Sequence, residues 1–93
     1  LFTLHYSPGI PLRLNVKKPN KGEAFILMKK RKKNSKDYFF LSKNNNLIKA
    51  ARNLYPLMRK IKNKGYKTIA VEKIPNIGIG RTINDRLERA SKY

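Results

Sequence analysis

The sequence predicts a small α/β domain, a Rossmann-like layered fold with about four strands in a mixed sheet, one long helix and a C-terminal helix. Three observations predict this class. Residues 45–65 carry apolar side chains at helical spacing, short apolar runs typical of strands lie before and after them, and a second helical pattern ends the chain. Short apolar runs that alternate with helical patterns are typical of layered α/β domains.

The long helix is expected over residues 46–64. Its apolar residues recur every three or four positions and therefore share one face: Leu47, Ala50, Ala51, Leu54, Met58 and Ile61. Asn45 or Asn46 can cap its first turn, and Gly65 can end it. Pro56 lies in the interior, where it removes a backbone donor. We therefore expect a kink near Pro56; two short helices that meet there are the alternative.

Four segments are expected to be strands: 12–16, 24–28, 37–42 and 67–74. The first alternates apolar and polar residues, as a half-buried edge strand does, whereas the second is continuously apolar, as a central strand is. The third and fourth flank the long helix. Together they should form a βαβ unit with a right-handed crossover.

The last helix is expected over residues 82–92. Thr82 and Asp85 have the spacing of a capping box, although Glu is more usual than Asp at the second position. Asp85 and Arg89 form a favourable pair one turn apart. The apolar stripe of this helix consists of Ile83, Leu87 and Ala90.

The composition restricts the possible functions. The 93 residues make one small domain, and the absence of cysteine excludes disulfides, thiolate metal sites and thiol nucleophiles. No apolar run approaches the roughly 18 residues that a membrane helix needs, so no membrane partner is expected. The chain begins at Leu1 rather than at methionine, which suggests a fragment of a longer polypeptide.

The charge is strongly basic, with 23 Lys and Arg against five Asp and Glu, and a formal net charge of +18. Such a charge indicates a polyanionic partner, nucleic acid first. A coding bias toward Lys, Asn and Ile explains it equally well. The densest run offers possible nucleic-acid contacts and precedes an aromatic stretch, but a solvated loop is the simpler interpretation: Lys29, Lys30, Arg31, Lys32 and Lys33.

Residues with catalytic chemistry are few. His5 is the single histidine, and the five acids lie apart without metal-ligand spacing. The glycines Gly78 and Gly80 precede a helix, but Ile83 replaces the third glycine of a dinucleotide fingerprint. A tight turn between strand and helix explains them better. We therefore expect no catalytic residue, no metal and no cofactor in this domain.

Three segments, in this order, resemble the C-terminal part of threonylcarbamoyl-adenylate synthases of the Sua/YrdC type. The first resembles the family's linker and the second, residues 50–59, its long helix. The third resembles its C-terminal signature. The linker residues are His5, Tyr6, Ser7 and Pro8, and the signature residues are Gly78, Gly80, Asn84, Asp85 and Arg86. The resemblance covers nearly the whole chain.

The resemblance implies an accessory or regulatory domain over residues 12–93, preceded by an interdomain linker over residues 1–11. A catalytic domain outside this chain would hold ATP and Mg²⁺ and make threonylcarbamoyl-AMP from ATP, L-threonine and bicarbonate. That product supplies threonylcarbamoyladenosine modification of tRNA.

The implied partner is that catalytic domain, in the cytoplasm. The basic charge, rather than the resemblance, makes tRNA or other RNA a further candidate partner. The linker would lie beside substrate, and the signature residues would be structural. Pro56 and the short 17–22 connection depart from the family pattern. A small basic RNA-binding module is the alternative.

Overall fold

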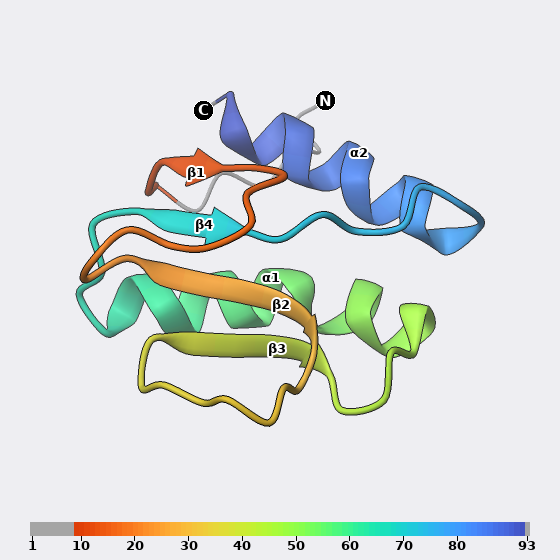
Figure 1. Ribbon diagram of the computed structural model, residues 1–93. Coiled ribbons are helices and arrows are strands. Elements are labelled where there is room, and N and C mark those ends of the chain that lie inside the picture. Colours follow the sequence, from red (N-terminus) through yellow and green to blue (C-terminus); the bar gives the residue numbers. More distant parts are fainter. Residues whose placement is uncertain (1–8, 93) are drawn as a thin grey trace.

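The computed structural model describes residues 9–92 and confirms the predicted α/β class (Figure 1). Six elements follow one another in the order strand, strand, strand, helix, strand, helix. They are β1 (Leu12–Arg13), β2 (Ala24–Lys29), β3 (Tyr38–Ser42), α1 (Leu47–Asn63), β4 (Ile69–Val71) and α2 (Ile79–Ser91).

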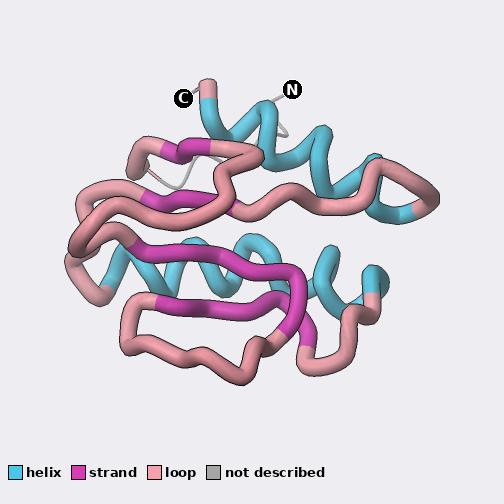
Figure 2. Tube along the Cα trace, in the orientation of Figure 1, coloured by secondary structure: helices cyan, strands magenta, loops and turns pink. Residues whose placement is uncertain are grey.

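The sheet has the strand order β1-β4-β2-β3, and each of its three pairings is parallel. The expected mixed sheet is therefore corrected to a parallel one. Parallel neighbours need a connection that returns the chain to the starting edge, and such a connection is usually a helix. Here only β3 and β4 are joined through a helix, whereas residues 14–23 and 30–37 return as loops (Figure 2).

Both faces of the sheet are covered. Helix α1 lies behind the sheet in Figure 1, which makes the β3–α1–β4 crossover right-handed, as expected. Ile26 and Val71 face the helices and belong to the main core. Phe25 and Leu27 point to the opposite face, where Val16 from the first loop packs against them. Burial on both faces explains the uninterrupted apolar run of β2.

Helix α1 runs without interruption from Leu47 to Asn63 although Pro56 lies inside it, so the two-helix alternative is wrong. Asn46 caps the helix as expected, because its side chain accepts a hydrogen bond from the backbone N–H of Lys49 at 3.0 Å. Gly65 follows the last turn with φ +95°, a conformation that glycine adopts without strain. The buried stripe is confirmed and consists of Ala50, Leu54, Met58 and Ile61.

The ends of three elements differ from expectation. β1 has only two residues, because Asn15 has φ +58° and turns the chain out of extended geometry. β4 has three residues. Helix α2 begins at Ile79, so Thr82 lies inside the helix and does not cap it. Its buried stripe is the expected one, Ile83, Leu87 and Ala90, with Gly80 in addition.

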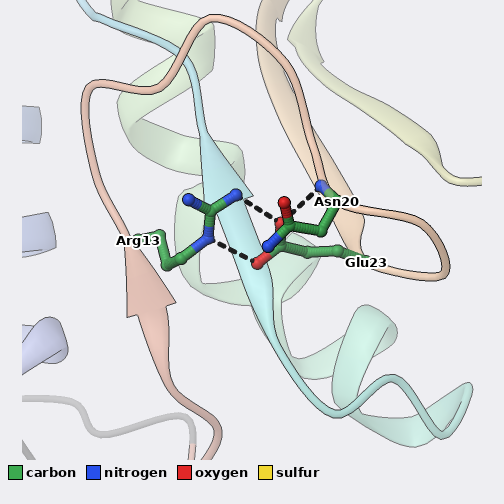
Figure 3. A network of polar contacts seen from close by, with 3 residues as sticks. All are labelled: Arg13, Asn20 and Glu23. Atoms are coloured by element: carbon green, nitrogen blue, oxygen red, sulfur yellow. Dashed lines mark hydrogen bonds and ion pairs between the residues drawn. The ribbon is translucent and has the colours of Figure 1, made fainter.

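A buried acid ties the first two strands together across β4 (Figure 3). Glu23 precedes β2 and is only 2% exposed. It accepts hydrogen bonds from Arg13 Nε at 3.0 Å, from Arg13 Nη2 at 2.7 Å and from the backbone N–H of Asn20 at 2.9 Å. The Arg13 guanidinium lowers the pKa of Glu23 to about 2, with smaller contributions from Asn20 and Thr68 that burial partly offsets.

We expect this contact to make the fold acid-sensitive. The pKa of Glu23 is lower in the folded chain than its ordinary value of 4.5. Its contribution is therefore complete above pH 4.5 and is lost as the pH falls toward 2, by roughly 2–3 kcal/mol. Denaturant titrations across this pH range measure it. Glu23→Gln should be less stable at neutral pH and should lose less on acidification.

Glu88→Gln provides the matched control, since Glu88 is an exposed acid on α2. It should keep the pH dependence of the unmodified chain. An equal acid sensitivity in Glu23→Gln and Glu88→Gln would contradict a special role for Glu23.

Candidate functional site

A cleft of about 340 Å³ opens at the carboxyl ends of β1 and β4. In open parallel sheets, ligands bind at this edge, where neighbouring strands lead to connections on opposite faces. β1 leads into the loop of residues 14–23, and β4 leads to α2 on the helix side. The cleft is lined by Leu14, Asn15, Val71, Glu72, Lys73, Ile74, Asn76, Asn84, Leu87 and Glu88.

Three signature residues hold the turn between β4 and α2, and one of them, Asn84, lines the cleft. A Cβ on Gly80 would lie 1.8 Å from the carbonyl oxygen of Pro75, so only glycine fits there. Asn84 Nδ2 donates to Ile74 O at 3.1 Å and to Asn76 Oδ1 at 3.2 Å. Gly78 precedes the helix with φ +53°. These contacts are structural, because they bind the chain to itself.

The other two signature residues lie outside the lining of the cleft. Asp85 forms an ion pair with Arg89 at 3.2 Å, at the expected spacing of one helical turn, and both side chains are more than half exposed. Such a pair contributes only about 0.3–0.5 kcal/mol. The Arg86 guanidinium lies 5.8 Å from the centre of the Tyr55 ring and connects α2 to α1. The signature residues therefore fall into two groups. Gly78, Gly80 and Asn84 hold the turn before α2, whereas Asp85 and Arg86 make contacts from the helix itself.

Glu72 is a carboxylate of the cleft that the sequence patterns did not single out. It directly follows β4, and its Oε2 accepts from the backbone N–H of Met28 at 2.7 Å. Its Oε1 accepts from Arg31 Nη2 at 2.5 Å. Oε2 thus binds the end of β2, and Oε1 holds the loop of residues 30–37 to the sheet through Arg31. The position of Glu72, directly after a short apolar strand, is the sequence feature that would have indicated this acid.

The basic run does not act as one surface. Arg31 pairs with Glu72, and its guanidinium lies 5.8 Å from the centre of the Phe25 ring, on the sheet face opposite the helices. Lys30 Nζ lies 6.0 Å from the centre of the Phe40 ring, which is 36% exposed. Arg31 therefore fastens the loop, whereas its four lysine neighbours are exposed to solvent: Lys29, Lys30, Lys32 and Lys33.

The candidate linker residues His5, Tyr6, Ser7 and Pro8 lie outside the described residues. The part of the linker that is described joins the fold. Ile10 is 4% exposed within the main core, and Pro11 O accepts a hydrogen bond from Ile69 N at 3.0 Å. The packed domain therefore includes residues before the expected boundary at Leu12.

Within residues 9–92, no three His, Cys, Asp or Glu side chains lie together as possible metal ligands. No helix in that range is long and apolar enough to cross a membrane.

A parallel four-stranded sheet with two helices and a glycine-dependent turn at its carboxyl edge defines a small Rossmann-like α/β domain. The family model described as threonylcarbamoyl-AMP synthase, C-terminal domain, matches residues 2–92, so the chain belongs to this family.

The fold also has a solved relative. The chain is similar to P. abyssi Sua5, whose crystal structure is complexed with L-threonine, with a TM-score of 0.70 and 21% sequence identity. The match covers 96% of this chain but only 30% of that protein's chain, so this domain corresponds to less than a third of the relative's length. At this identity the similarity shows the fold. No curated protein matches the sequence.

Proposed function

We propose that this chain is the accessory domain of an enzyme that makes threonylcarbamoyl-AMP from ATP, L-threonine and bicarbonate for the modification of tRNA. The family match over residues 2–92 carries the proposal. The solved relative, by its description, binds L-threonine, and this chain spans 30% of it. Adenylation, with its ATP and Mg²⁺, would then take place in a separate catalytic domain.

The carboxylates of this domain support a non-catalytic role. Four of the five acids have contacts within the domain: Glu23 with Arg13, Asp37 with Tyr66, Glu72 with Arg31, and Asp85 with Arg89. An acid–base pair needs carboxylates that face a common substrate position. These four instead stabilise separate loops and one helix.

The surface proposed to contact the catalytic domain lies beside the cleft. Ile77 is 66% exposed and lies in the turn before α2, and Ile79, the first residue of α2, is 39% exposed. Exposed apolar side chains close together in the sequence are typical of a contact surface. The linker residues, named by the resemblance, would extend from this domain toward the substrate of its partner.

Threonine-dependent release of pyrophosphate from ATP tests the proposal. The chain alone should release none, and the catalytic domain joined to this domain should differ in kcat or KM from the catalytic domain alone. Ile77→Ser combined with Ile79→Ser should move the joined enzyme toward the catalytic domain alone. The control, Lys17→Ser with Lys18→Ser, changes two exposed residues that do not line the cleft and should have no effect.

Two outcomes would overturn the proposal. One is threonine-dependent pyrophosphate release by the chain alone. The other is identical kinetics and identical melting of the catalytic domain with and without this domain.

A further inference from the structure

A depression of about 640 Å³ lies at the edge of the sheet opposite the cleft, where β2, β3 and β4 begin. This edge is on the left in Figure 1. Three connections meet there, namely those from β1 to β2, from β2 to β3 and from α1 to β4. We call it the lysine basin after its cationic lining residues, Lys21, Lys36, Lys64 and Lys67.

The four ammonium groups form no ion pair with a carboxylate within residues 9–92. The three ion pairs of residues 9–92 involve Arg13, Arg31 and Arg89, and none includes a basin lysine. The basin holds one carboxylate, Asp37, which accepts a hydrogen bond from the Tyr66 hydroxyl at 2.6 Å. That bond raises the pKa of Tyr66 to about 12, so the hydroxyl stays protonated at neutral pH. The lining is therefore strongly cationic.

Stabilisation of the fold explains only one of these lysines. Lys64 is the C-cap of α1, where a cation interacts favourably with the helix dipole. Lys21, Lys36 and Lys67 lie in loops, are exposed to solvent and have no such role. Like charges that line one depression repel one another, and a bound anion would relieve that repulsion.

The chemistry of the lining indicates what kind of anion. Lysine binds phosphate as a point charge, with several rotatable donors and little geometric demand. The Tyr66 ring packs at a right angle to Phe39, with 5.8 Å between ring centres, and is half-buried. The basin thus offers mainly cationic donors, which suit phosphate groups.

We propose that the lysine basin binds phosphate groups, either on an RNA backbone or on a small polyphosphate. The basin lysines are different residues from the basic run of residues 29–33, which is the densest cluster of positive charge in the sequence. The inference does not depend on the proposed enzymatic role, since the basin lies at the edge opposite the cleft and its signature turn.

Binding of a short single-stranded RNA and of inorganic pyrophosphate, each measured at about 0.1 M salt, tests the proposal. At that salt concentration, charges more than about 10 Å apart are largely screened. The basin variant replaces Lys21, Lys36, Lys64 and Lys67 with Gln. Its matched control replaces Lys29, Lys30, Lys32 and Lys33 with Gln and removes the same charge from exposed positions. Thermal melting checks that both variants fold.

The basin variant should bind at least about tenfold more weakly, while the control stays within about threefold of the unmodified chain. For RNA, the slope of log affinity against log salt should flatten by about 3 in the basin variant, since each neutralised phosphate of a single strand contributes about 0.7. If the basin variant loses affinity for RNA alone, the ligand is an RNA backbone. If it loses affinity for pyrophosphate, the ligand is a small polyphosphate. Either result supports the proposal.

Equal loss of binding in the two folded variants would overturn the proposal, because binding would then follow total charge. A larger loss in the control would do so as well and would assign binding to the basic run. Absence of saturable binding for both probes would also overturn it.

Discussion

Leu54→Ala is expected to lower the free energy of unfolding by about 2–5 kcal/mol. Leu54 is 0% exposed and lies in the middle of α1, within the main core. Its truncation removes apolar contacts and leaves a cavity that the surrounding sheet and helices fill only in part. Urea denaturation of the two proteins, with the same slope in both transitions, measures the difference.

Ile48→Ala is the matched control on the same helix. Ile48 is 57% exposed, so its truncation should change stability by no more than about 0.5 kcal/mol. A loss below about 0.5 kcal/mol for Leu54→Ala, or equal losses for both variants, would show that α1 buries another face.

Gly80→Ala is expected to destabilise the chain although alanine is the better helix former. The added Cβ would lie 1.8 Å from the carbonyl oxygen of Pro75 and 3.0 Å from its carbonyl carbon. These are backbone atoms, and the neighbouring Ile74 carbonyl is held by Asn84. Overpacking costs about 1–3 kcal/mol and sometimes more, against a gain of about 1 kcal/mol in helix propensity. We expect a net loss of about 2 kcal/mol, measured by urea denaturation.

Thr82→Ala, two residues further along α2, is the control for Gly80→Ala. Thr82 is exposed inside the helix, so alanine should be neutral or slightly stabilising. An unchanged or higher stability of Gly80→Ala would contradict the close approach to Pro75. A loss of about 1 kcal/mol in Thr82→Ala would instead support Thr82 as the helix cap.

Features that depend on neighbouring residues were predicted correctly. The buried stripe of α1, its Asn46 cap and the Gly65 terminus all follow from side chains within one or two helical turns. The stripe of α2 and its Asp85–Arg89 pair follow in the same way. The start of α2 was placed too late, because Gly78 and Gly80 resemble a loop unless Pro75 is known to lie against the helix.

The direction of the two loop connections was not predictable, unlike that of the crossover through α1. Whether residues 30–37 turn back as a hairpin or cross the sheet depends on what the loop can bury. The loop crosses because Arg31 covers Phe25 and binds Glu72, which is 41 residues away in the sequence. The parallel sheet is a consequence of such contacts. The Arg13–Glu23 pair likewise forms only when β4 lies between its partners.

The candidate sites likewise include features that the sequence predicts and features that only the tertiary structure creates. Composition and local pattern were sufficient for the α/β class, for both amphipathic helices and for a basic protein with few catalytic groups, because periodicity and charge are properties of the chain itself. Tertiary structure alone brought Lys21, Lys36, Lys64 and Lys67 from three connections to one edge. It also separated Arg31 from the exposed lysines around it. Which charges gather and which are paired depends on the packing of distant segments, which no local pattern encodes.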